Sequence, residues 1–119
     1  MKIKDKFELL ALHRCLLEAK FSPSPNDGDI AGSPIVAKLA NEVVDELVSI
    51  DGSQWNEWRI AENKEPFVSR LISALKQQNL EHVPSNEQRL FIIDALAPLK
   101  ATDKTVTKII TEVFGGNSI

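Results

Sequence analysis

Three side chains of this chain have the chemistry for nucleophilic catalysis: the thiol of Cys15 and the imidazoles of His13 and His82. A thiol nucleophile needs a base within hydrogen-bond reach. His13 and Cys15 are two residues apart in a segment with helical periodicity, so their side chains point in different directions. His82 reaches either of them only through the tertiary fold. We therefore interpret Cys15 as a packed or partly exposed thiol and both histidines as ordinary surface residues, and we predict no catalytic residues.

The sequence also has few candidate residues for binding a metal ion or a nucleotide. One cysteine and two distant histidines do not make a zinc site. The turn at residues 26–29 contains two aspartates but lacks the alternating ligands and the terminal glutamate of an EF-hand calcium loop. Neither of the common glycine-rich phosphate-binding motifs occurs. The sequence therefore predicts a protein that is not an enzyme and that binds no metal or cofactor.

An acidic stretch occupies the middle of the chain. Residues 42–65 carry a net charge of −5, whereas residues 1–41 and residues 66–119 each carry +1. The charged residues of the stretch are Glu42, Asp45, Glu46, Asp51, Glu57, Arg59, Glu62, Lys64 and Glu65. Because opposite charges attract over long range and accelerate association, this stretch favours a partner with a basic surface.

Both tryptophans, Trp55 and Trp58, lie in the same acidic stretch. Aromatic side chains at the centre of an interface commonly supply much of the binding energy. We therefore predict a partner-binding face made of the two rings and the carboxylates around them: Glu42, Asp45, Glu46, Trp55, Glu57, Trp58 and Glu62. Two simpler interpretations stay open, namely that the tryptophans close the hydrophobic core and that the carboxylates form an ordinary solvated face.

Lysines near the C-terminus form a second charged pattern. Lys100, Lys104 and Lys108 recur every four residues, a spacing that aligns them as a basic ridge along and just before the last helix. Asp103 and Glu112 interrupt this ridge, and the sequence pI of about 5.4 is acidic. Nucleic-acid binding is therefore the less favoured alternative, and a solvated lysine face is the simpler interpretation.

The composition predicts one helical domain over residues 1–119. With 43% hydrophobic and 26% charged residues, the chain is long enough for a core of its own. Cys15 is the only cysteine, which excludes an intramolecular disulfide and fits a cytoplasmic location. Charged residues interrupt the apolar run near the N-terminus, so we predict no secretion signal. No apolar run is long enough to predict a membrane span.

Apolar residues recur at helical spacing along most of the chain, and no segment shows convincing strand alternation. Capping residues, prolines and glycines mark the helix ends, most clearly Ser33 with Pro34 at the start and Gly52 at the end of the second helix. We predict helices over about residues 4–20, 34–51, 54–62, 66–79, 85–98 and 103–114, a longest loop at residues 22–33 and a frayed C-terminus at residues 115–119. The predicted fold class is all-α, a compact bundle or an irregular array of five to six helices, with the first helix near its centre.

Finer expectations concern caps and apolar stripes. Ser53 and Asp103 are predicted N-caps, and residues 85–88 match a capping box. The predicted stripe of the fifth helix contains Leu90, Ile93 and Leu96, and that of the second helix contains Val36, Leu39, Ala40, Val43, Val44, Leu47 and Ile50. The segment from Glu87 to Phe114 loosely resembles one helix pair of a HEAT-type repeat. Because no second copy follows with matching phase, we predict no solenoid.

These patterns favour a non-enzymatic, protein-binding domain. The most concrete form of this hypothesis is a small acidic protein of the immunity or antitoxin type, which neutralises a basic partner such as a toxin nuclease. Small size, acidity and lack of a cofactor are the gross properties that it shares with such proteins. The alternatives are a helical adaptor or a small subunit of a larger assembly, and with less support a nucleic-acid-binding protein.

Overall fold

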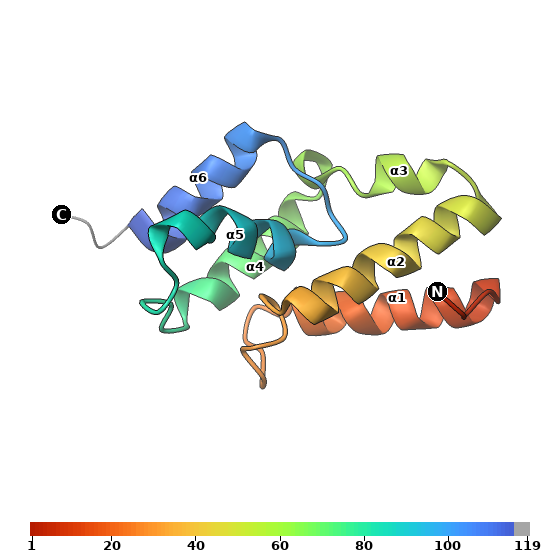
Figure 1. Ribbon diagram of the computed structural model, residues 1–119, viewed down its shortest axis with the longest axis horizontal. Helices are drawn as coiled ribbons and strands as arrows, with labels where there is room; N and C mark the ends of the chain where they lie inside the picture. The colour runs from red at the N-terminus through yellow and green to blue at the C-terminus, as the bar shows by residue number, and fades with distance from the viewer. Residues whose placement is uncertain (116–119) are drawn as a thin grey trace.

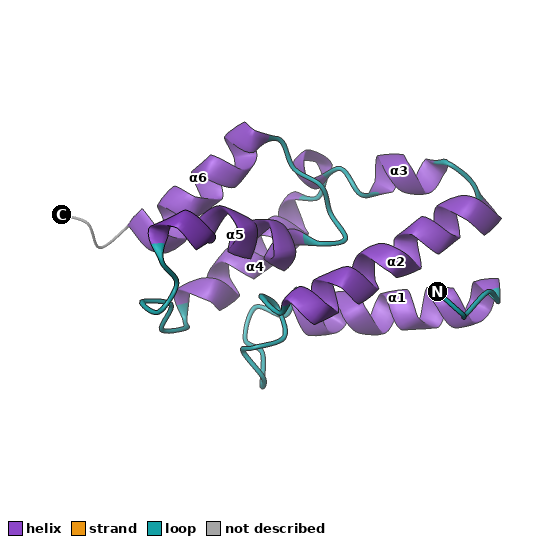
Figure 2. Ribbon diagram, in the orientation of Figure 1, coloured by secondary structure: helices purple, strands orange, loops and turns teal. Residues whose placement is uncertain are grey.

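The computed structural model describes residues 1–115, which form six α-helices and two short 3₁₀ helices with no strand among the described residues (Figures 1 and 2). This confirms the predicted all-α class. The elements are α1 (Lys6–Lys20), α2 (Pro34–Asp51), α3 (Gln54–Trp58), η1 (Ala61–Asn63), α4 (Glu65–Lys76), η2 (Ser85–Glu87), α5 (Gln88–Leu96) and α6 (Asp103–Phe114). A frayed end is predicted for residues 115–119, of which residues 116–119 lie outside the described part of the chain.

The helices form an elongated molecule of 50 × 29 × 24 Å. α1 and α2 run antiparallel side by side at one end, and α4, α5 and α6 gather at the other (Figure 1). The chain between them passes through α3, which lies beside α2 (Figure 1). Residues 21–33, between α1 and α2, are the longest connection within the described chain, close to the predicted loop.

The hydrophobic core consists of two clusters that match the two ends of the molecule. The smaller cluster holds Leu9 of α1 against Val43 and Leu47 of α2. The larger cluster joins α4, α5 and α6, with Phe21 and Ala31 from the long connection: its fully buried members include Leu71, Leu75, Ile92, Ala95 and Leu96. Apolar burial of this kind supplies the main driving force for folding.

The bounds of α2 confirm the prediction from its caps. The Ser33 hydroxyl accepts a hydrogen bond from the backbone N–H of Val36 at 3.3 Å, and Pro34 follows at the first helical position. At the other end Gly52 adopts a φ of 125°, a conformation that residues with a side chain rarely adopt. Local sequence signals therefore suffice to place both ends of this helix.

The third helix is shorter than predicted. It ends at Trp58 rather than near residue 62, because the chain leaves the helix to meet the α5–α6 connection. Ile60 and Lys100 form an isolated parallel bridge, in which the Lys100 N–H donates to the Arg59 carbonyl at 2.7 Å. This long-range pairing has no signature in the local sequence.

Two predicted caps are wrong, and a third, Ser53, is in the predicted N-cap position but makes no capping bond. Ser53 precedes α3 but its side chain makes no capping hydrogen bond, and residues 85–87 form η2 instead of a capping box. The N-cap of α6 is Thr102, whose hydroxyl accepts from the Thr105 N–H at 3.3 Å, and Asp103 is the first helical residue. α4 also stops at Lys76, three residues before the predicted end.

Several predicted core residues face solvent. Leu90 and Ile93 of α5 are exposed, and Ile92 and Ala95 take their places in the core. Leu39 and Ile50 of α2 are also exposed, at the edges of its predicted stripe. In α1 only Leu9, His13 and Lys20 are buried, so this helix lies at one side of the molecule and not at its centre.

We predict that Leu47→Ala lowers the free energy of unfolding by about 2–5 kcal/mol, because Leu47 is fully buried and its removal leaves a cavity. Leu39→Ala is the matched control, since it makes the same change on the same helix at a 41% exposed position and should cost about 0.5 kcal/mol or less. Urea unfolding followed by circular dichroism measures both. Equal costs would contradict the assigned phase of α2.

Candidate functional site

The seven predicted partner-binding residues lie on three successive elements. Glu42, Asp45 and Glu46 belong to α2, and Glu62 belongs to η1. The other three, Trp55, Glu57 and Trp58, belong to α3. α3 packs on α2, whereas Glu62 is bonded to the start of α6, so the structure does not join the seven residues into a single cluster.

Five of the seven carboxylates in the acidic stretch form a hydrogen bond or an ion pair within the fold. Glu46 pairs with Lys4 at 2.7 Å, and Asp51 pairs with Lys6 at 2.9 Å. Lys4 lies just before α1 and Lys6 is its first residue, and together they reduce the net charge of −5 along residues 42–65 to −3 in the folded protein. The acidity of the sequence therefore overstates the acidity of the surface.

Glu42 and Glu57 make no hydrogen bond or ion pair through their side chains with any residue from 1 to 115. Asp45 pairs with Arg59 at 2.8 Å, yet its side chain remains 64% exposed. Glu42 and Glu57 are consequently the members of the predicted face whose charge is most available to a partner, whereas the exposed Asp45 is partly neutralised by Arg59.

Both tryptophans are half-buried and pack against His13 of α1. The ring centroids of His13 lie 5.2 Å from Trp55 and 4.8 Å from Trp58, in edge-to-face geometry. The indole N–H of Trp55 donates to Asp51 at 2.9 Å, and the ammonium of Lys64 lies 5.6 Å from the Trp58 ring. The two rings thus attach α3 to α1, as in the interpretation that they close the core, and each keeps part of its surface in solvent.

His13 is not the surface histidine that the sequence suggested. Only 6% of it is exposed, and burial lowers its pKa from 6.5 to about 4. Its ring is therefore neutral at physiological pH. Cys15 is exposed on α1, and His82 is exposed in the connection between α4 and η2. Of the three candidate residues, only His13 is buried, and it packs against the rings of Trp55 and Trp58.

Arg59 is the buried residue that the sequence analysis missed. Its side chain is only 4% exposed, and its guanidinium donates to the Pro98 carbonyl at 3.0 Å, to Asp45 at 2.8 Å and to Asn41 at 2.9 Å. One side chain thus connects α2, the end of α3 and the α5–α6 connection. One sequence signal could have revealed this site: Arg59 is the single arginine of the acidic stretch, and Asn41 and Asp45 are spaced one helical turn apart.

Lys20 is a second buried cation that the sequence does not reveal. It is fully buried at the end of α1, and its ammonium donates to the Ala31 and Asp94 carbonyls, each at 2.9 Å. Burial lowers its pKa to about 8, against an opposing effect of the Asp94 carboxylate. Lys20 thereby attaches the long α1–α2 connection to α5.

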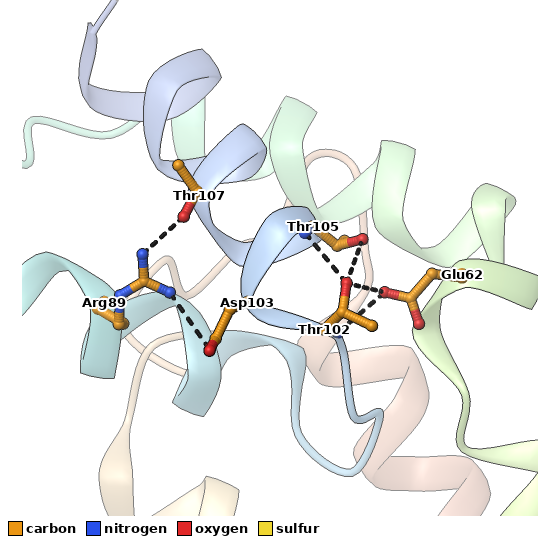
Figure 3. A network of polar contacts seen from close by, with 6 residues as sticks. All are labelled: Glu62, Arg89, Thr102, Asp103, Thr105 and Thr107. Carbon is orange, nitrogen blue, oxygen red and sulfur yellow. Dashed lines mark hydrogen bonds and ion pairs between the residues drawn. The ribbon is translucent and has the colours of Figure 1, made fainter.

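Glu62 lies beside the N-terminus of α6 (Figure 3). Its carboxylate accepts a hydrogen bond from the Thr102 N–H at 3.0 Å. A hydrogen bond from the Thr105 side chain is the largest cause that lowers the pKa of Glu62, and the contact with Thr102 adds to it. On the other side of α6, Arg89 donates to the Thr107 hydroxyl at 2.6 Å (Figure 3). The Glu62 carboxylate therefore stays ionised and fixed in place.

The lysines of the predicted basic ridge do not form a continuous surface of one charge. Lys100 is held by its backbone beside Ile60, and Lys104 and Lys108 are exposed on α6. Lys108 lies in a groove that also contains Glu62 and other carboxylates. A phosphate backbone approaching this groove would meet acidic side chains.

Residues 1–115 contain neither a cluster of metal ligands nor a membrane-spanning helix. No three side chains among histidine, cysteine, aspartate and glutamate come close enough there to hold a metal ion. No helix in the same part of the chain has both the length and the apolarity that a membrane span needs.

Comparison with models of protein families, with curated proteins and with solved structures finds no match to this chain.

Replacing Arg59 by methionine should lower the free energy of unfolding by on the order of 3 kcal/mol, because the buried Pro98 carbonyl loses its donor. Asp45→Asn should cost less than about 1 kcal/mol, since that side chain stays in contact with water. Arg14→Met, at an exposed position, is the control. Urea titrations measure the free energy of unfolding of all three variants. If Asp45→Asn lowers it as much as Arg59→Met does, the stabilisation comes from the ion pair alone and not from the bond to Pro98.

His13 should make stability depend on pH between about 4 and 6.5. Because its pKa is lower in the folded state, the unfolded chain binds more protons in this range, so stability falls by about 3 kcal/mol as pH drops from 6.5 to 4. His13→Phe keeps an aromatic ring but cannot titrate, and it should flatten this slope. Unfolding free energies of the wild type, His13→Phe and the control His82→Gln across this range test it; an unchanged slope in His13→Phe would contradict the assignment.

Proposed function

We propose that this protein is a non-enzymatic binding domain for a protein with a basic surface. The observation that carries the proposal is the segregation of charge: residues 42–65 keep an excess of carboxylates after their internal ion pairs are counted. Its most concrete form is an immunity or antitoxin role in the cytoplasm, in which the acidic face covers the basic surface of a toxin. Such a role needs complementary charge and a stable scaffold rather than a reactive group.

The distribution of free charge supports this assignment. Glu42 and Glu57 have no internal partner among residues 1–115, and Asp45 is largely exposed beside its arginine. Charges of this kind act on the rate of encounter, whereas the partly exposed rings of Trp55 and Trp58 add apolar contact to the complex. The rings are held by His13, which limits the entropy lost on binding.

A role as adaptor or small subunit of an assembly is the second candidate. The supporting observation is on α5, where Leu90 is 61% and Ile93 is 45% exposed. Neither residue is one of the seven predicted for the acidic face. Nucleic-acid binding has less support, because Lys108 shares its groove with Glu62, Glu65 and Glu112.

The charge-reversed double variant Glu42→Lys/Glu57→Lys tests the proposal. Proteins retained by the immobilised wild-type chain are identified by mass spectrometry and produced individually, and their association rates are measured at low and high salt. The variant should associate more slowly than the wild type and show a weaker salt dependence, because it removes steering charges without breaking an internal ion pair. Glu81→Lys/Glu87→Lys, an equal charge change on exposed residues elsewhere, is the matched control.

Two results would contradict the proposal. One is a partner that binds both double variants at the wild-type rate. The other is a loss of binding confined to substitutions of Lys100, Lys104 and Lys108 together with binding of nucleic acid, which would instead favour the nucleic-acid alternative.

A further inference from the structure

A groove of about 320 Å³ runs between α4 and α6. The two helices begin at the same end, where Glu62 of η1 bonds to the Thr102 N-cap of α6, and they run in the same general direction (Figure 1). Apolar side chains form the floor of the groove: Ala61, Val68, Ile72 and Ile109. This floor is continuous with the larger hydrophobic cluster.

Carboxylates stand along the edges of the groove. Glu62 and Glu65 lie on the side of α4, and Glu112 lies on α6. Glu62 is held by Thr102, and Glu65 accepts a hydrogen bond from Ser69 at 2.8 Å. The side chain of Glu112 forms no hydrogen bond or ion pair with residues 1–115, and among these residues Lys108 is the only cation that lines the groove. The lining therefore has an excess of two negative charges.

This combination of floor and edge restricts the class of occupant. A metal ion needs ligands that converge, and these carboxylates do not form such a group in the described chain. An apolar ligand would leave the carboxylates unused. A lysine or arginine side chain satisfies both parts, because its aliphatic stem can lie on apolar surface while its charged end meets carboxylates.

We propose that the groove between α4 and α6 binds a lysine or arginine side chain of a partner protein, with Glu62, Glu65 and Glu112 as the acceptors. This proposal rests on the proposed function, because it names the group by which a basic partner docks. It also extends the acidic face beyond the predicted residues, since Glu65 lies at the end of the acidic stretch and Glu112 lies far from it in the sequence. Lys108 competes with the incoming cation.

Three small probes test the groove on the isolated protein: N-acetyl-arginine amide, N-acetyl-lysine amide and N-acetyl-norleucine amide. Each is titrated at constant ionic strength into protein labelled with nitrogen-15, and backbone amide shifts are followed by NMR. Both cationic probes should shift residues of the groove, notably Ala61, Ser69, Thr105 and Ile109. The norleucine probe, which has a similar stem without the charge, should shift them far less.

Variants of the groove give the second readout. Glu112→Gln should weaken binding of the cationic probes roughly two- to five-fold, the effect of one solvent-exposed ion pair, without loss of any internal contact. Lys108→Met should strengthen it, and Glu87→Gln, outside the groove, should leave it unchanged. Equal binding of the norleucine probe, shifts elsewhere on the protein, no shifts at all, or an unaffected Glu112→Gln variant would each overturn the proposal.

The two proposals can fail separately. If the probes bind the groove but Glu42→Lys/Glu57→Lys leaves the association rate unchanged, the groove stands and the proposed acidic face falls. If the probes do not bind but that double variant slows association, the proposed function stands and the groove assignment falls.

Discussion

The guanidinium of Arg59 is the point at which α2, the end of α3 and the α5–α6 connection meet. A buried cation is tolerated only when its donors are satisfied, because the loss of hydration costs several kcal/mol. Asn41 and Asp45 of α2 and the Pro98 carbonyl supply the acceptors, and each comes from a segment that must be in place before the arginine can be buried. The bridge between Ile60 and Lys100 then ends α3 and sets where α4 begins.

Buried polar side chains lie where the two hydrophobic clusters meet. His13 contacts Trp55, which packs on the smaller cluster, and Trp58, which packs on the larger one. Lys20 attaches the α1–α2 connection to α5. Apolar packing is non-directional, whereas hydrogen bonds and edge-to-face rings depend on geometry. These contacts therefore fix how the α1–α2 pair is oriented on the α4–α6 group.

The sequence predicts those features whose causes are local. The bounds of α2 follow from Ser33, Pro34 and Gly52, and the all-α class follows from apolar periodicity. The phase of α5 was wrong, because its core residues are decided by contacts with other helices and its sequence is apolar on most sides. Arg59, Lys20 and His13 are buried because they contact acceptors and rings that lie 11 to 74 residues away along the chain. Local residue spacing in the sequence therefore does not predict that these side chains are buried.

The acidic stretch illustrates why charge along a sequence is an incomplete guide to a surface. Its carboxylates differ in what they do: Asp45 neutralises a buried arginine, Glu46 and Asp51 hold the N-terminal lysines, and Glu62 meets the start of α6. A carboxylate that stabilises the fold has part of its field cancelled by its partner, so it contributes less to attraction at a distance. The remaining negative charge is concentrated where side chains have few internal partners. That condition holds at Glu42 and Glu57, and it holds again at Glu112, which sequence distance alone would have separated from the acidic stretch.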